Sequence, residues 1–311
     1  MKKWIVVACT LFLLFLVAVF FLIPRNLFVN RSISTKASYK GITRFIQADS
    51  NWNRWQHESF GGNGKKFKLG GFTFNKTNSL FSSAEFNIEN NGQIWTGALH
   101  ILPDGEDSVQ ILWEASTETG NNPLRKIRRY IQTRALGREI DIMLSSFKDF
   151  VSNVRNLYSI DIKEEKVKIE YLVSAKKVFD HYPQTGEIYK LIGELRAYVA
   201  LKNGKEEDFP MLHFWDSTTK PVAVQVAIPV NTKLPETAQF ISKRMLKNGN
   251  ILVAEVKGGR ATVDFAMKQV EQYLTDHHYS NVAIPFQSLV TDRIKQPDSS
   301  NWITRVYYPI R

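Results

Sequence analysis

The chain has 311 residues, and its composition, 43% hydrophobic and 12% aromatic, is that of a globular protein rather than a disordered or fibrous one. This length allows about two domains, each able to bury its own core. Cys9 is the only cysteine, which excludes a disulfide and a cysteine metal site. Although the net charge is +11, the basic residues are scattered, so we expect no nucleic-acid partner.

The densest basic run lies in the middle of the chain and is read as a solvated helix face. It consists of Arg125, Lys126, Arg128, Arg129, Arg134 and Arg138. If the run has a function, the interpretation preferred for a membrane-anchored chain is contact with lipid head groups.

Residues 4–23 form an uninterrupted apolar segment without a charge. A helix of this length spans about 30 Å, the thickness of a bilayer core, so the sequence predicts a transmembrane anchor over residues 1–24. Lys2 and Lys3 favour an inside N-terminus, although basic residues also follow the segment. The prediction is a single-pass membrane protein with an extracytoplasmic body and the lipid bilayer as a partner. A cleaved signal peptide and a lipoprotein signal at Cys9 are the alternatives.

Residues 25–165 are predicted to form a first α+β module. A strand at its start is followed by a helical segment, several alternating strand-like runs and a long amphipathic helix that Pro123 opens. The sequences Asn90-Asn91-Gly92 and Pro103-Asp104-Gly105 mark turns between strands. Gly137 is expected to kink or break the long helix.

This module resembles the START-like (SRPBCC, polyketide-cyclase-like) superfamily, in which a sheet grips a long helix. The residues that carry the resemblance are Ile33, Ala37, Asn51-Trp52, Trp55, Asp107-Ser108, Trp113 and Asn122-Pro123. The resemblance implies an apolar cavity for a lipid or other hydrophobic ligand, with Trp52, Trp55, Trp95 and Trp113 as lining candidates. The alternative is that these tryptophans are plain core.

Residues 166–311 are predicted to be an internal duplication with repeats at about 166–230 and 250–311. One apolar stripe at helical spacing runs from Ile188 to Val199, and a second runs from Val263 to Leu274. Pro210 and Pro285 precede equivalent strands. The pattern therefore predicts the order strand-helix-strand-strand for each half. The two halves should form one sheet with both helices on one face and a groove on the other.

This second module resembles the gyrase-inhibitor-like family, the effector-binding domain of many transcription activators. The resemblance rests on Ile284-Pro285-Phe286, Thr291-Asp292 and the run from Trp302 to Pro309. It implies a groove that binds small, often cationic or aromatic, molecules. The ligand-binding candidates in this module are His213, Trp215, Gln287, Trp302 and Tyr308.

Two positions depart from the resembled family. Gln287 stands where the family usually has a cation-binding glutamate, and Leu289 stands where it usually has a tyrosine. A neutral amide cannot balance a buried positive charge. A neutral, small hydrophobic or aromatic ligand is therefore expected in place of a cation.

The sequence shows no catalytic set. The histidines have no metal-ligand spacing, and neither a phosphate-binding loop nor a nucleophile elbow occurs. We therefore expect no catalytic residues, no metal and no cofactor. The leading prediction is a membrane-anchored, noncatalytic small-molecule-binding protein. The alternatives are a hydrolase or cyclase that uses one of the two pockets, and a transcription regulator.

Overall fold

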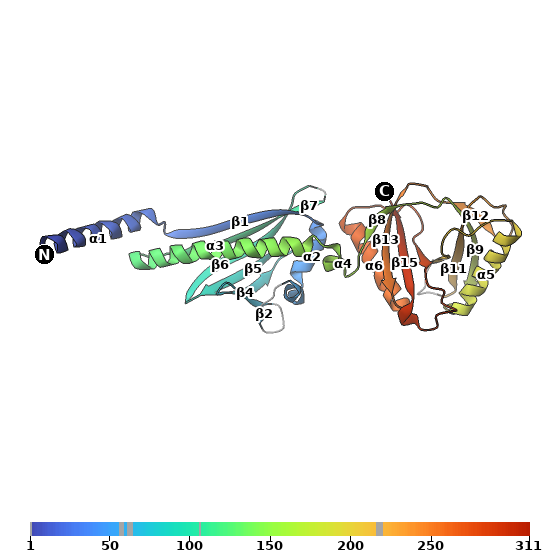
Figure 1. Ribbon diagram of the computed structural model, residues 1–311. Coiled ribbons are helices and arrows are strands. Elements are labelled where there is room, and N and C mark those ends of the chain that lie inside the picture. Colours follow the sequence, from blue (N-terminus) through green and yellow to red (C-terminus); the bar gives the residue numbers. More distant parts are fainter. Residues whose placement is uncertain (1, 56–58, 61–64, 106, 216–219) are drawn as a thin grey trace. The chain divides into compact units, whose positions relative to one another are not determined.

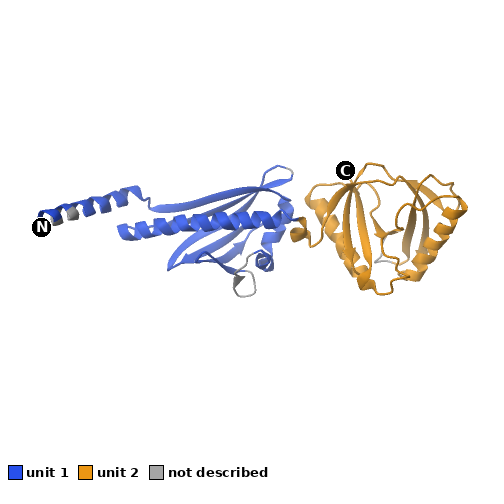
Figure 2. Ribbon diagram, in the orientation of Figure 1, with its two compact units in different colours: residues 1–153 blue, residues 154–311 orange. Residues whose placement is uncertain are grey.

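The computed structural model describes residues 2–55, 59–60, 65–105, 107–215 and 220–311 (Figure 1). The chain divides into two compact units, Met1–Asn153 and Val154–Arg311 (Figure 2). Each unit contains one antiparallel sheet and helices, so the predicted α+β class is confirmed at this level. The division falls earlier in the chain than the predicted start of the second module at residue 166.

The N-terminal apolar segment forms helix α1 (Lys2–Leu22). The side chains of residues 2, 5, 6, 8 and 9 of this helix lie outside the described part of the structure. Within the part of the chain that is described, no helix has the length and apolarity needed to cross a membrane. This finding contradicts the prediction of a single-pass anchor with an extracytoplasmic body. The prediction that the lipid bilayer is a partner depended on this anchor and is corrected with it.

The first unit is built on a seven-stranded sheet in the order β1-β7-β6-β5-β4-β3-β2. The strands are β1 (Asn26–Lys36), β2 (Ser59–Phe60), β3 (Lys66–Leu69), β4 (Phe72–Ser79), β5 (Ser83–Asn90), β6 (Gln93–Pro103) and β7 (Ser108–Glu118). The predicted turn between β5 and β6 is confirmed: Asn91 and Gly92 both adopt positive φ, as the tight turn of a two-residue hairpin requires.

Two helices and a 3-10 turn complete the first unit: α2 (Tyr39–Gln47), the turn Asp49–Arg54 and the long α3 (Pro123–Val151). Asn122 caps α3 by accepting hydrogen bonds from the amides of Leu124 and Arg125, and Pro123 occupies the first turn. The predicted break at Gly137 is wrong, since α3 continues through it. A side chain there would lie 3.0 Å from the guanidinium of Arg31, so glycine permits close approach to β1.

The basic run on α3 is not uniformly solvated. Lys126 is buried, and its ammonium group donates hydrogen bonds to the carbonyl oxygens of Phe20 and Ile23 at 3.0 and 2.9 Å. These carbonyls lie at and just beyond the C-terminal end of α1, where a positive charge is favourable. Lys126 therefore serves as a structural contact between α3 and the end of α1.

An aromatic cluster forms the core of the first unit. Phe67 stacks on Phe74 at 4.8 Å, and Trp113 packs against Phe86 at 4.9 Å between ring centres. Trp52 and Trp113 are 1% and 0% exposed. The structure thus packs these tryptophans against other aromatic rings, the arrangement expected of core residues.

A partly buried ion pair lies beside this cluster. The ammonium group of Lys76, whose side chain is 2% exposed, contacts the Asp49 carboxylate at 2.8 Å and donates a hydrogen bond to the carbonyl of Ile46. It also lies 5.1 Å from the centre of the Trp52 ring. The hydrogen bond from Lys76 holds the pKa of Asp49 below its usual value.

The Asp49 pair should make the first unit acid-sensitive. A carboxylate whose folded pKa is depressed stabilises the fold above its unfolded pKa of about 4, and this stabilisation is lost as pH falls through the folded pKa. We expect Asp49→Asn to lower stability at pH 6 and to flatten the decline below about pH 4. Urea unfolding of both proteins at pH 6 and pH 3 measures this difference. Identical pH dependence in the two proteins would contradict the assignment.

The second unit is built on an eight-stranded sheet in the order β12-β9-β11-β10-β14-β15-β13-β8. Its strands are β8 (Lys163–Lys166), β9 (Tyr171–Phe179), β10 (Met211–Phe214), β11 (Val222–Val230), β12 (Ile241–Arg244), β13 (Asn250–Lys257), β14 (Phe286–Leu289) and β15 (Ile303–Ile310). The middle six strands are arranged as β9-β11-β10 beside β14-β15-β13. The short strands β10 and β14 pair with each other at the centre.

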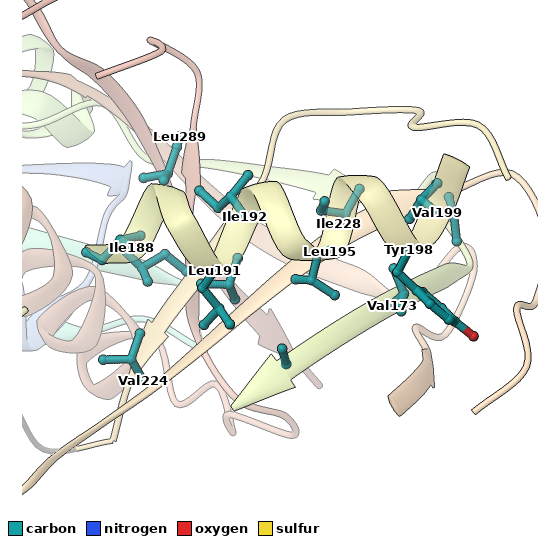
Figure 3. Close-up of a cluster of buried hydrophobic side chains, with 14 of the residues drawn as sticks. Val173, Ile188, Leu191, Ile192, Leu195, Tyr198, Val199, Val224, Ile228 and Leu289 are labelled. Atoms are coloured by element: carbon teal, nitrogen blue, oxygen red, sulfur yellow. The ribbon is translucent and has the colours of Figure 1, made fainter. Parts of the chain in front are cut away.

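The helices of the second unit are α4 (Val154–Tyr158), α5 (Thr185–Leu201) and α6 (Arg260–Asp276). The apolar stripe of α5 packs on β9 and β11, where Ile188, Leu191 and Leu195 meet Val173 and Val224 (Figure 3). The stripe of α6 packs in the same way on β13 and β15. The two predicted stripes are therefore the buried faces of two helices of equal length, 17 residues each.

Candidate functional site

Two cavities lie on the two faces of the second unit's sheet. Strand alternation separates the faces: in β10, Leu212 belongs to the core under α5, whereas Met211 packs with Leu172 and Ala227 on the opposite face. We call the cavity on the face away from α5 and α6 the strand-face cavity. The cavity beside the N-terminal ends of both helices is called the inter-helix cavity.

The strand-face cavity has a volume of about 270 Å³ and is largely apolar. Met211, Ala227, Met245, Ile284 and Phe286 supply its apolar lining. These residues come from β10, β11, the end of β12 and the start of β14, so the pairing of the two halves brings them together. The volume is close to the lower end of the range typical of small-molecule pockets, about 300–1,000 Å³.

Two ionisable groups in the strand-face cavity have pKa values shifted toward their neutral forms. Burial lowers the pKa of His213, and burial together with nearby Lys176 lowers the pKa of Lys243. Arg244 is also at this cavity, but its exposed guanidinium pairs with Glu170 at 2.6 Å. The cavity therefore disfavours positive charge on the His213 imidazole and the Lys243 amine.

The inter-helix cavity has a volume of about 370 Å³ and a different chemistry. Its lining includes Gln287 on β14 and Trp302 just before β15. Tyr182 and Phe214 add a stacked pair with 5.1 Å between ring centres and 17° between planes. The first residues of α5 and α6, Thr185 and Arg260, also line this cavity.

Two guanidinium groups lie against aromatic rings in the inter-helix cavity. The Arg260 guanidinium carbon is 3.6 Å from the centre of the Tyr182 ring, and the Arg293 guanidinium carbon is 4.6 Å from the centre of the Trp302 ring. Arg260 also pairs with Asp264 at 3.3 Å. Burial lowers the pKa of Arg293, which indicates a charged group that is poorly compensated.

The predicted site residues fall in four places. His213 lines the strand-face cavity, whereas Gln287 and Trp302 line the inter-helix cavity. The Trp215 ring is 4.9 Å from the His213 ring. Tyr308 is buried under α6, where its hydroxyl lies 3.0 Å from the Glu271 carboxylate and burial raises its pKa.

The other three candidates, Trp52, Trp55 and Trp113, lie in the aromatic core of the first unit. The indole N–H groups of Trp55 and Trp113 are buried and have no hydrogen-bond partner among the described atoms. Within the same described residues, no group of three or more His, Cys, Asp or Glu side chains is placed to hold a metal ion.

The two arginines of the inter-helix cavity were missed by the sequence reasoning. Arg293 directly follows Thr291-Asp292, which is one of the motifs that carry the resemblance, and Arg260 directly follows Gly258-Gly259 at the start of α6. Their direction could not be predicted, because an arginine next to a turn usually extends into solvent. The apolar lining of the strand-face cavity was also missed, since it comes from four separate strands or strand ends.

Comparisons with known proteins give weak structural likenesses. The crystal structure of the EcmrR C-terminal domain is 15% identical, covering 49% of this chain and 98% of that chain with a TM-score of 0.42. A conserved protein from Listeria innocua is 11% identical, covering 49% and 92% with a TM-score of 0.38. Neither likeness shows a family for the chain. No family model matches the chain, and no curated protein matches it.

One similar structure corrects the partner prediction. It is the cryo-electron microscopy structure of an EcmrR–DNA complex, 15% identical, covering 60% of this chain and 71% of that chain with a TM-score of 0.44. Because a DNA complex stands among the similar structures, the prediction that nucleic acid is not a partner is withdrawn.

Proposed function

We propose that the chain is a noncatalytic binding protein for a neutral, hydrophobic small molecule, which occupies the strand-face cavity. The observation that carries the proposal is the apolar lining of this cavity by Met211, Met245, Ile284 and Phe286. Removing such surface from water is worth about 25 cal/mol per Å². A ligand with an apolar body gains this contribution without leaving a polar group of its own unpaired.

The electrostatics of the cavity support a neutral ligand. His213 and Lys243 have lowered pKa values, and burial is the main cause for both. A ligand cation would be repelled by Lys243 and would find no carboxylate among the described residues that line the cavity. His213 and Gln225 can each form a hydrogen bond to a polar atom of the ligand, which would fix its orientation.

We also propose that the first unit is a START-like helix-grip domain. Its support is the seven-stranded antiparallel sheet with β1 beside the long helix α3. Because Trp52 and Trp113 are packed in the core, this unit is assigned a structural role and the ligand site is placed in the second unit.

The neutral fluorescent dye N-phenyl-1-naphthylamine should bind the full chain in this cavity. Ala283 lines the cavity and is exposed, so Ala283→Trp fills the entrance without overpacking the core. We expect this variant to bind the dye at least tenfold more weakly, a loss of about 1.4 kcal/mol. Fluorescence titration measures the affinity.

Val282→Trp provides the matched control. Val282 is the neighbouring residue, is 56% exposed and does not line the cavity. It should bind the dye as the unaltered chain does. Equal affinity of the Ala283→Trp and Val282→Trp variants, with both folded, would place the dye elsewhere and contradict the proposal.

A further inference from the structure

We propose that the inter-helix cavity is a second binding site, and that its ligand is an organic anion: a carboxylate- or phosphate-type group attached to a planar aromatic ring. This inference concerns the opposite face of the sheet from the strand-face cavity. It rests on separate residues and does not depend on the proposed neutral ligand.

Arg293 provides the first reason. Its guanidinium is fixed on one side, because Nη2 donates a hydrogen bond to the Thr304 hydroxyl at 2.9 Å and the face lies over Trp302. Its Nε is buried and has no partner among the described atoms. Burial lowers the pKa of Arg293, and the nearby Tyr189 and Tyr182 offset this only in part. A half-buried guanidinium with unused donor capacity is a site that an anion would complete.

The charges of the lining residues also favour an anionic ligand. Among the described residues that line this cavity there are two guanidinium groups, Arg260 and Arg293, and one carboxylate, Asp264. Asp264 is committed to Arg260 at 3.3 Å. Gln287 contributes an amide, which leaves the surplus positive charge in place and can itself donate a hydrogen bond.

The ends of two helices add to this positive field. Helix α5 begins at Thr185 and helix α6 begins at Arg260, and both residues line the cavity. The positive end of each helix dipole therefore adjoins the same space. Gly259 stands at the N-cap of α6 and has no side chain with which to satisfy the first amides. The helix dipoles add to the positive charge of the two arginines, which are the main source of the field.

The walls of the cavity select the shape of the ligand. Tyr182 and Phe214 form a stacked pair, and the Trp302 ring lies under Arg293. The ring edges and faces that remain open to the cavity favour a planar ring packed against them. The volume of about 370 Å³ is that of a pocket for a small molecule. Together these features describe an aromatic acid or an aromatic phosphate.

The probes for a test are 2-naphthoate and its neutral amide, 2-naphthamide. We expect isothermal titration calorimetry to show that the full chain binds the acid more tightly than the amide. Arg293→Gln and Arg260→Gln should each weaken binding of the acid about 10- to 100-fold, the loss typical of a charge-assisted hydrogen bond. Both variants should leave binding of the amide almost unchanged. Arg260 is largely exposed, so its variant keeps the test decisive even if Arg293→Gln unfolds.

Two controls separate this cavity from the other one. Arg244→Gln removes an exposed guanidinium at the strand-face cavity and should leave binding of 2-naphthoate unchanged. Ala283→Trp, which blocks the strand-face cavity, should also leave it unchanged. Weakened binding in these two variants rather than in the Arg260 and Arg293 variants would overturn the assignment, as would equal affinity of the unaltered chain for acid and amide. Failure of the neutral dye to bind bears only on the proposed function.

Discussion

A fragment of residues 154–311 should unfold in one cooperative transition, whereas a fragment of residues 166–311 should be close to unfolded at room temperature. The difference lies in the segment from Tyr158 to Ile162. Tyr158, Ile160 and Ile162 are all buried in the core under α6, with 1%, 8% and 7% exposure. Removing the segment takes three members out of a core cluster that also contains Val270 and Leu274.

The size of the effect follows from burial and hydrogen bonding. Each buried isoleucine contributes about 1.5–3 kcal/mol. The Tyr158 hydroxyl donates a hydrogen bond to the buried Asp276 carboxylate at 2.8 Å, and a bond of this type contributes a further ~1.5–3 kcal/mol. The expected loss is on the order of 5 kcal/mol, comparable with the whole stability of a small domain.

Thermal melting followed by circular dichroism compares the two fragments. Tyr158→Phe in the longer fragment is the matched variant, since it removes only the hydroxyl and should lower stability by about 1–3 kcal/mol. If the fragment 166–311 melted as sharply and as high as 154–311, the boundary at Val154 would be wrong.

Trp113→Ala should be the most damaging single substitution in the first unit. Trp113 is fully buried and packs against Phe74 and Phe86, with 5.8 and 4.9 Å between ring centres. Its removal leaves a cavity among rigid rings that cannot collapse. We expect a loss of about 3–5 kcal/mol of unfolding free energy, measured by urea denaturation.

Trp113→Phe tests whether Trp113 is a core residue or lines a ligand cavity. It keeps an aromatic ring and removes the indole N–H that lacks a partner among the described atoms, so part of the packing loss is offset. We expect this variant to lose less than half as much stability as Trp113→Ala. If Trp113→Ala proved stable and instead bound hydrophobic dye differently, Trp113 would line a ligand cavity.

Local signals in the sequence predicted much of the fold. The Asn122-Pro123 pair marked the start of α3, and Asn91-Gly92 marked a hairpin. The two apolar stripes gave the buried faces of α5 and α6, because helical periodicity reports directly on which side is covered. These features depend on a few neighbouring residues, which is why a single sequence contains them.

The candidate sites were less predictable, since they depend on which strands become neighbours. Phe286 and Gln287 are adjacent in β14, yet Phe286 lines the strand-face cavity and Gln287 lines the inter-helix cavity. The sequence placed Gln287 in a groove opposite the helices, and its one-residue offset from Phe286 puts it on the helix side instead. The arginines around Gln287 change the charge of the ligand expected at this position, because an amide beside two guanidinium groups favours an anion rather than a neutral ligand.

A crystal structure of the full chain with N-phenyl-1-naphthylamine would show directly where the neutral ligand binds. We expect electron density for the dye in the strand-face cavity, in contact with Met211, Met245 and Phe286. The dye should be accommodated without rearrangement of β10 and β14. Density for the dye in the inter-helix cavity or in the first unit, with the strand-face cavity empty, would contradict the proposed ligand site.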